Sequence, residues 1–192
     1  MGLKVDERRS WQGRQWGGVA QATVRNMQEA PLRIVVMGVS GCGKSSLGDA
    51  LAQALGLPLI EGDDFHPPAN VAKMRDGIPL ADVDRAGWLQ ALGEQLASHA
   101  QGAVLTCSSL KRAYREQLRA AAPGLRFVFM RISHDEALQR VAQRAAAHMF
   151  PASLVSSQFA ALESPDAEPG VLCVEATAPL GELVTAVRVW LG

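Results

Sequence analysis

The sequence predicts an α/β domain whose core is a five-stranded parallel sheet flanked by helices in three layers. Five short apolar runs alternate with segments in which apolar residues recur at helical spacing. Strands joined by helices in this way form parallel sheets with right-handed crossovers. The chain has 192 residues, of which 48% are hydrophobic, so it can bury one substantial core. We therefore expect one folded domain over residues 31–192.

The predicted strands are continuous apolar runs, as is typical of strands buried on both faces of a parallel sheet. They cover residues 32–37, 57–60, 103–107, 125–132 and 171–176. The helical segments cover residues 44–55, 85–99, 108–122, 134–144, 153–162 and 179–191. The segment between the second strand and the second helix is rich in Pro, Gly and Asp. We expect a loop there, with at most a short helix near residues 70–75.

Local residues indicate where several of these helices begin and end. Glycine suits a helix C-terminus, and Ser or Asp suits an N-cap because its side-chain oxygen accepts a free backbone N–H. The predicted caps are Gly56 after the first helix, Asp84 before the second, Ser108 or Ser109 before the third, and Ser133 with Glu136 before the fourth. The inward face of the second helix is predicted to carry Trp88, Leu89, Leu92 and Leu96.

The composition argues against several classes of protein. Nineteen basic and 19 acidic side chains give a net charge of zero, which does not favour a nucleic-acid partner. The three cysteines are scattered, which argues against a disulfide framework and a zinc site. No apolar run approaches the ~18 residues that span a bilayer, and the N-terminus lacks the apolar region of a secretory signal. We expect a soluble cytoplasmic protein that binds neither nucleic acid nor membrane.

The segment between the first strand and the first helix matches the phosphate-loop pattern G-x-x-x-x-G-K-[ST] in the required strand–loop–helix context. Its glycines let the backbone N–H groups converge on one point, and the helix N-terminus adds partial positive charge. A glycine-rich turn can match by chance, but the flanking strand and helix favour a nucleotide phosphate site. We expect Lys44 to contact the β- and γ-phosphates and Ser45 to ligate magnesium. The residues predicted to bind the nucleotide are Gly38, Val39, Ser40, Gly41, Cys42, Gly43, Lys44, Ser45 and Ser46.

An acidic cluster over residues 61–64 follows the second strand. Ligands of open α/β sheets bind beyond the carboxyl ends of the strands, and this cluster lies at such an end. Phosphoryl transfer to an alcohol needs a carboxylate that orients the hydroxyl and accepts its proton. Asp63 and Asp64 are candidates for that base, and Glu61 is a candidate to hold a magnesium-bound water. Any one of these residues alone could instead be a solvated turn residue.

The irregular segment beyond this cluster adds polar and cationic side chains: His66, Asn70, Lys73, Arg75 and Arg85. A polyhydroxy acid needs a cation for its carboxylate and hydrogen-bonding groups along its hydroxyls, and this segment offers both. Two alternatives stay open. His66 precedes two prolines and can shape that turn instead, and Arg75 can be solvated.

Three stretches of the chain resemble the gluconokinase family. The longest, EGDDFHPPANVAKMRDGIPLADVDRAGWL, is similar to the family pattern HP-x-x-N-x-x-KM-x-x-G-x-PL-x-D-x-DR-x-x-WL. The others are VLTCSSLKRAYREQLR, similar to CSALK-x-x-YR-x-x-LR, and SQFAALESP, similar to SQ-x-x-TLE-x-P. The resemblance runs from about Leu32 to the C-terminus. The longest stretch is quite specific, whereas many unrelated NTPases share the phosphate loop.

The resemblance implies a P-loop fold like that of nucleoside-monophosphate kinases, with a small helical lid. It also implies phosphorylation of D-gluconate to 6-phosphogluconate with ATP and magnesium, often by a homodimer. By position it makes Asp63 the base, and the candidates for substrate contact are Asp63, His66, Asn70, Lys73, Arg85 and Lys111. The interrupted helix near Arg144 matches the lid, so Arg144 or Arg140 is expected to offset charge on the transferred phosphoryl group. An exposed basic helix face is the alternative for both arginines.

The chain departs from the family pattern in the lid and at residues 61 and 109. The lid reads Ala147-His148-Met149-Phe150 where the family has a sequence close to G-H-F-M, and loss of the glycine would stiffen the hinge. Glu61 stands where several relatives carry Asp, and Ser109 stands in place of an alanine. Neither the lid change nor Glu61 removes a group that the chemistry requires.

Residues 1–30 show no clear periodicity, and we expect a poorly ordered N-terminal extension. Met27 lies just before the first strand, where compact kinases of this kind usually begin. We therefore hypothesise that Met27 is the true translation start.

Other functions remain possible at this stage. A shikimate-type or other sugar-acid kinase would share the phosphate loop and differ in the acceptor pocket, and the His-Pro and Lys-Met segment speaks against shikimate. A non-catalytic ATP-binding regulatory module would bind ATP without acceptor-stimulated release of ADP. A nucleoside-monophosphate kinase would need more arginines around the acceptor phosphate than this segment contains.

Overall fold

The computed structural model describes residues 31–144, 151 and 153–192, without the side chain of Arg144. The expected N-terminal extension with Met27 and the lid residues 147–150 lie outside this range.

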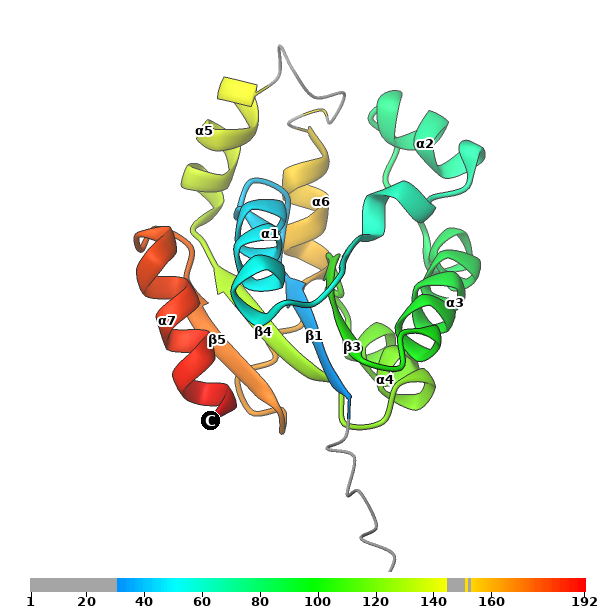
Figure 1. Ribbon diagram of the computed structural model, residues 1–192. Helices are drawn as coiled ribbons and strands as arrows, with labels where there is room; N and C mark the ends of the chain where they lie inside the picture. Colours follow the sequence, from blue (N-terminus) through cyan, green and yellow to red (C-terminus); the bar gives the residue numbers. More distant parts are fainter. Residues whose placement is uncertain (1–30, 145–150, 152) are drawn as a thin grey trace, which may run out of the picture.

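Five parallel strands form one sheet in the order β2-β3-β1-β4-β5, and Figure 1 shows the run of β3, β1, β4 and β5. The strands are β1 Leu32–Met37, β2 Leu59–Glu61, β3 Gly102–Cys107, β4 Arg126–Arg131 and β5 Val171–Glu175. This confirms the predicted five-stranded parallel sheet. The central strand β1 pairs with both β3 and β4, so the phosphate loop that follows it lies in the middle of the sheet edge.

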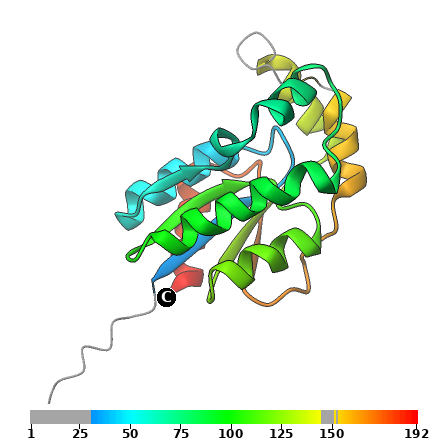
Figure 2. The same ribbon diagram turned by 90° about the vertical axis from the view of Figure 1, so that its right-hand side faces the viewer.

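Helices cover both faces of the sheet, which gives three layers. They are α1 Lys44–Leu55, α2 Pro68–Arg75, α3 Asp82–Ser98, α4 Arg112–Ala121, α5 His134–Arg144, α6 Ser153–Ala161 and α7 Leu180–Leu191, with a 3-10 turn, η1, over Gly62–Phe65. Helices α1 and α7 pack on one face, and α3 and α4 pack on the other, the face toward the viewer in Figure 2.

The side chains of β1 alternate between these two layers. Ile34 and Val36 are buried against α1 and α7, whereas Val35 and Met37 are buried against α3 and α4. Alternation of this kind follows from the two-residue period of a strand. The four residues predicted to face inward from α3, Trp88, Leu89, Leu92 and Leu96, are all buried in the second of these layers.

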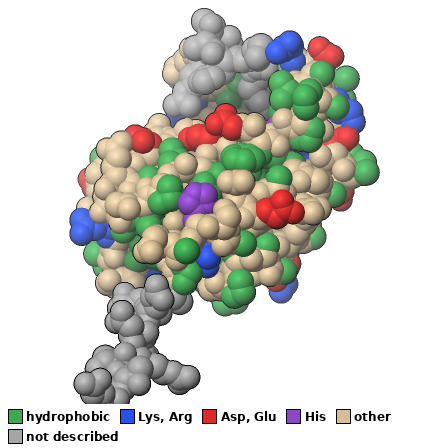
Figure 3. Space-filling model, turned by 45° about the vertical axis from the view of Figure 1, so that its right-hand side comes forward, with side chains coloured by type: hydrophobic (Ala, Val, Ile, Leu, Met, Phe, Trp, Pro, Cys, Tyr) green, Lys and Arg blue, Asp and Glu red, His purple; other side chains and the backbone are tan. Residues whose placement is uncertain are grey.

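The surface carries no single-sign charged face in the view of Figure 3, where acidic, basic and hydrophobic side chains are interspersed. This agrees with the net charge of zero. No helix of the described residues is both long enough and apolar enough to cross a membrane.

The prediction that Asp84 caps α3 was wrong. The helix begins three residues earlier than predicted, at Asp82, and Ala81 is the N-cap. Asp84 lies in the first turn, where its carboxylate accepts the N–H of Ala81 at 2.8 Å. A carboxylate in the first turn can accept the free N–H of the N-cap residue. Asp84 therefore stabilises a helix that begins at Asp82 instead of capping one that begins after it.

The predicted cap of α4 by Ser108 or Ser109 was also wrong. The helix begins at Arg112, and the N–H of Arg112 donates to the Glu163 carboxylate at 2.6 Å. The capping group therefore comes from a residue 51 positions further along the chain. The cap at Ser133 is confirmed by the hydrogen bond from the N–H of Glu136 to the Ser133 hydroxyl at 3.2 Å.

The segment before α3 contains more helix than predicted. The turn η1 follows β2 directly, and α2 begins at Pro68. Proline suits the first turn of a helix because its missing N–H has no intrahelical partner there.

Candidate functional site

The phosphate loop connects the carboxyl end of β1 to the N-terminus of α1. Gly41 has φ of 86°, a backbone conformation that side-chained residues rarely adopt, and a Cβ there would lie 2.8 Å from the carbonyl oxygen of Ala137. Val39 and Cys42 turn their side chains into the core. These two residues can therefore contribute only backbone groups to a ligand.

Lys44 lies at the start of α1 with its side chain folded back over the loop. Its ammonium group donates to the carbonyl oxygen of Val39 at 3.1 Å. This position keeps a full positive charge beside the loop N–H groups, as a triphosphate site requires.

Three oxygen-bearing side chains meet beside the loop. The hydroxyl of Thr106 donates to the Glu61 carboxylate at 2.5 Å, and the hydroxyl of Ser45 donates to the same carboxylate oxygen at 3.3 Å. The N–H of Gly62 in turn donates to the Thr106 hydroxyl at 3.3 Å. These contacts join the ends of β2 and β3 to the start of α1.

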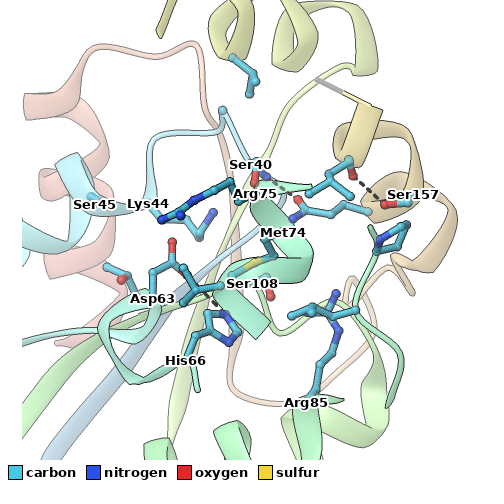
Figure 4. A pocket seen from close by; sticks show the side chains of 18 of the residues that line it. Ser40, Lys44, Ser45, Asp63, His66, Met74, Arg75, Arg85, Ser108 and Ser157 are labelled. Atoms are coloured by element: carbon cyan, nitrogen blue, oxygen red, sulfur yellow. Dashed lines mark hydrogen bonds and ion pairs between the residues drawn. The ribbon is translucent and has the colours of Figure 1, made fainter. Parts of the chain in front are cut away.

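A cavity of about 360 Å³ opens between the phosphate loop, η1, α2, α3 and α6. Lys44, Asp63 and Arg85 point into it from three different elements (Figure 4). The predicted site residues that line it are Ser40, Gly41, Gly43, Lys44, Ser45, Ser46, Asp63, His66, Arg75 and Arg85. The structure thus brings the phosphate loop and part of the acidic and cationic segment to one cavity.

Asp63 presents a largely free carboxylate to this cavity, with 86% of its side chain exposed. It follows Gly62, where a side chain would overlap the carbonyl oxygen of Thr106, so only glycine allows η1 to lie so close to β3. Asp64 is exposed and does not line the cavity.

His66 is held on the cavity wall by an aromatic stack. Its side chain is 3% exposed, and its ring stacks on Trp88 with 4.1 Å between ring centroids. The indole N–H of Trp88 donates to the carbonyl oxygen of Gly62 at 2.7 Å. Burial lowers the pKa of His66, the Arg85 charge lowers it further, and the Asp63 charge opposes the shift, so the imidazole is neutral near pH 7. His66 therefore both shapes the turn and lines the cavity.

The cationic side chains predicted to bind substrate divide into those with an ion-pair partner and those without one. Lys73 pairs with Asp84 at 2.6 Å, and Lys111 pairs with Asp82 at 2.6 Å. Arg85 has no ion pair within the described residues and lies over the Tyr114 ring at 5.8 Å. Arg75, which also lines the cavity, likewise has no ion pair within the described residues, so Arg75 and Arg85 are the predicted cations available to a ligand charge.

Three predicted substrate contacts do not line this cavity. Asn70 is buried and donates to the backbone carbonyl of Asp84 at 2.7 Å, and Lys73 takes part in the ion pair described above. Lys111 lines a second cavity of about 520 Å³, which Arg85 and Tyr114 also line. The role of each as a substrate contact stays a prediction.

A family model described as AAA domain (AAA_33) matches residues 34–165. A gluconokinase of Gluconobacter oxydans is 50% identical over 143 residues, which cover 72% of this chain and 80% of that protein. The thermosensitive gluconokinase of Escherichia coli is 42% identical over 137 residues, which cover 70% of this chain and 73% of that protein.

The chain belongs to the gluconokinase family.

Solved structures agree with this membership. A gluconokinase from Sinorhizobium meliloti has a TM-score of 0.77 and 48% identity, covering 84% of this chain and 92% of that one. A sugar kinase from Janibacter has a TM-score of 0.79 and 36% identity, covering 84% and 94%. The P-loop kinase fold predicted from the sequence is therefore confirmed.

The cavity of this gluconokinase-family chain has lining residues for which no role in the site was predicted from the sequence. Gln158 and Ser157 come from α6, Thr106 from the end of β3, Ser108 from the turn after it, and Met74 from α2. Ser157 and Gln158 belong to the stretch SQFAALESP, which carried part of the family resemblance. That resemblance was the available signal, but it pointed to the family and not to a contact.

Of the two lid arginines, only Arg140 has a described side chain. It donates to the Glu136 carboxylate at 3.0 Å and to the carbonyl oxygen of Ala176 at 3.2 Å. The predicted catalytic side chain of Arg144 lies outside the described residues.

Proposed function

We propose that this chain transfers the γ-phosphoryl group of ATP to the terminal hydroxyl of D-gluconate, giving 6-phospho-D-gluconate. Membership of the gluconokinase family supports the reaction. The reaction is assigned to these residues because a phosphate-loop lysine, an exposed carboxylate and an arginine line the same cavity. A sugar-acid kinase needs all three groups within reach of one bound pair of substrates.

On the nucleotide side, the loop backbone from Gly38 to Ser46 cradles the phosphates and Lys44 neutralises the transferred charge. The residues beside the loop fit magnesium, because Ser45 and Glu61 offer a hydroxyl and a carboxylate 3.3 Å apart. Magnesium in kinase sites takes one or two protein oxygens together with phosphate and water oxygens. When bound there it would polarise the phosphoryl oxygens. Thr106 holds the Glu61 carboxylate in position for this role.

On the acceptor side, Asp63 orients the terminal hydroxyl of the sugar acid and accepts its proton. Its carboxylate faces the cavity, and within the described residues the only nitrogen at salt-bridge distance is that of the neutral His66 imidazole, at 4.0 Å. Arg85 receives the carboxylate of the acid, because a guanidinium binds a carboxylate through two parallel hydrogen bonds. Arg75, which also lines the cavity, is the second cation available for substrate charge.

The lid completes the proposed site. Arg144 follows Arg140 by one helical turn at the end of α5, and we assign it the role of offsetting charge on the phosphoryl group in flight. We also propose that the protein is a homodimer, which light scattering of the purified protein would test.

The test is release of ADP from ATP and magnesium with D-gluconate, shikimate, other sugar acids and nucleoside monophosphates as separate acceptors. Strong stimulation by gluconate alone is the expected result. Stimulation by a different acceptor would keep the kinase chemistry and overturn the assignment of the acceptor. Binding of ATP without stimulation by any acceptor would instead favour the non-catalytic regulatory module.

A further inference from the structure

Helix α6 carries a polar side chain that contacts the phosphate loop directly. The side-chain oxygen Oε1 of Gln158 accepts the backbone N–H of Ser40 at 2.7 Å. Gln158 is half-buried and lines the same cavity as Lys44 and Asp63. Leu154 and Ser157 line it too, and their spacing puts all three on one face of the helix.

This contact fixes the orientation of the Gln158 amide group. A backbone N–H can only donate, so the oxygen of the amide must face Ser40 and the NH2 group must point elsewhere. That NH2 group has no hydrogen-bond partner within the described part of the chain, while its residue borders the cavity. The amide therefore has two N–H donors beside the phosphate loop that bind no described residue.

The helix that carries Gln158 is firmly attached to the rest of the domain. Val155 is fully buried in the core, and the His134 ring lies 2.9 Å from the Ser156 hydroxyl. At the far end, the N–H of Glu163 donates to the carbonyl of Leu110 at 2.9 Å. A donor on such a support loses little freedom when it binds, which is the condition for effective stabilisation of a transition state.

We propose that Gln158 holds the phosphate loop at Ser40 through its carbonyl oxygen and donates from its NH2 group to the γ-phosphoryl group during transfer. This inference rests on the proposed kinase function. A neutral donor at this position stabilises charge on the phosphoryl oxygens without adding a cation that would also bind ADP tightly. It complements the charge of Lys44, which lines the same cavity.

Two substitutions separate the two roles. Gln158→Glu keeps an oxygen for the N–H of Ser40 but removes the NH2 donors and adds a negative charge. Gln158→Leu removes both. We expect Gln158→Glu to lower kcat about 100-fold, the usual effect of losing one such donor, with KM for gluconate changed less than about threefold. Gln158→Leu should lower kcat at least as much.

The matched control is Gln101→Glu, which makes the same charge change in an exposed turn before β3, at the opposite edge of the sheet. It should leave kcat unchanged. Melting temperatures of all variants show whether each one is folded. If folded Gln158→Glu kept half of the wild-type kcat while Gln158→Leu lost activity, Gln158 would only hold the loop and the donor role would be overturned. Near-normal activity of both would overturn the whole proposal.

A binding measurement keeps this proposal separate from the proposed function. ADP lacks the γ-phosphoryl group, so Gln158→Glu should weaken a nonhydrolysable ATP analogue about tenfold more than ADP. This ratio needs no acceptor. If wild-type protein showed no gluconate-stimulated turnover, the proposed function would fail, and an unchanged ratio would still overturn the contact with the γ-phosphoryl group.

Discussion

Three aspartates, one in η1 and two in the first turn of α3, differ in their partners. Hydrogen bonds from Lys111 and Tyr114 lower the pKa of Asp82, and hydrogen bonds from Lys73 and the Ala81 backbone lower that of Asp84. Both carboxylates are thus committed to structural contacts and are poor proton acceptors. Within the part of the chain that the structure describes, Asp63 has no such partner, and its side chain is 86% exposed at the cavity.

Asp63→Asn should therefore remove the proton acceptor while leaving the size of the side chain unchanged. We expect kcat to fall at least 10²-fold, as is typical when a general base is lost. Calorimetric titration with ATP should give an unchanged affinity, because Asp63 lies outside the phosphate loop. Asp64→Asn, one residue away and outside the cavity, is the control and should retain activity. Near-normal turnover of Asp63→Asn would mean that a different group accepts the proton.

Ser109 is a residue whose side chain does not fit its surroundings. It is fully buried, its φ is 43°, and its hydroxyl has no hydrogen-bond partner within the described residues. The neighbouring Cys107 thiol, whose pKa burial raises to about 11, is a weak donor and a weak acceptor and offers this hydroxyl at most a weak hydrogen bond. A buried hydroxyl of this kind costs free energy because it has lost its water.

Ser109→Ala should accordingly stabilise the protein. Removing the unsatisfied hydroxyl should raise the free energy of unfolding by about 1 kcal/mol, or roughly 2 to 4 °C in melting temperature. Calorimetry of the two proteins measures the difference. Ser108→Ala serves as the control, because Ser108 lines the cavity and is only partly buried. A lower melting temperature for Ser109→Ala would show that the hydroxyl has a partner after all.

At the scale of elements, one buried arginine joins α4 to the segment after α6. Arg115 is fully buried, and its guanidinium donates to the carbonyl oxygens of Ser109, Leu110 and Glu163. It also forms an ion pair with Glu168, whose side chain is 9% exposed. These contacts hold the turn after β3, which brings Ser108 to the cavity.

This ion pair makes stability depend on pH in a defined direction. Burial alone would raise the pKa of Glu168, but hydrogen bonds from Arg115 and Arg119 outweigh it and the net pKa is lowered from 4.5. The folded state therefore favours the ionised carboxylate. The stabilisation is complete above the unfolded pKa of 4.5 and is lost as the pH falls through the lower pKa of the folded state.

Glu168→Gln should thus be destabilised at pH 7 and progressively less so, relative to wild type, below pH ~4.5. We expect a loss of about 3 kcal/mol at neutral pH, or roughly 6 to 12 °C, because Arg115 is left without its carboxylate. Melting temperatures between pH 7 and pH 3 measure this. Glu116→Gln breaks exposed pairs with Arg112 and Arg119 and should change stability by less than about 1 kcal/mol. A difference that stayed constant over this pH range would mean that the charge of Glu168 contributes nothing.

At the scale of the whole molecule, the features that could be predicted from the sequence are those determined by residues close together along the chain. The five strands and the phosphate loop follow from apolar runs and a local motif, and both were found as expected. The partners of Lys73 and Lys111 lie 11 and 29 residues away, and no local pattern indicates that these lysines are paired. The contact between Gln158 and Ser40 spans 118 residues. Such contacts depend on how helices cross over the sheet, which residue spacing does not encode.

Because the cavity is lined by α1, η1, α3 and α6, a ligand in it should stabilise the domain as a unit. A nonhydrolysable ATP analogue with magnesium, at about 100 times its Kd, should add about 2.7 kcal/mol to the free energy of unfolding. That corresponds to roughly 5 to 10 °C in melting temperature for a chain of this size. D-gluconate should add a further shift, and Asp63→Asn should retain the nucleotide shift.

Lys44→Ala should lose most of this nucleotide-induced shift in melting temperature, because the Lys44 ammonium is the full charge beside the loop. It should also lower kcat about 10²-fold or more. An undiminished shift in Lys44→Ala would mean that the nucleotide binds elsewhere.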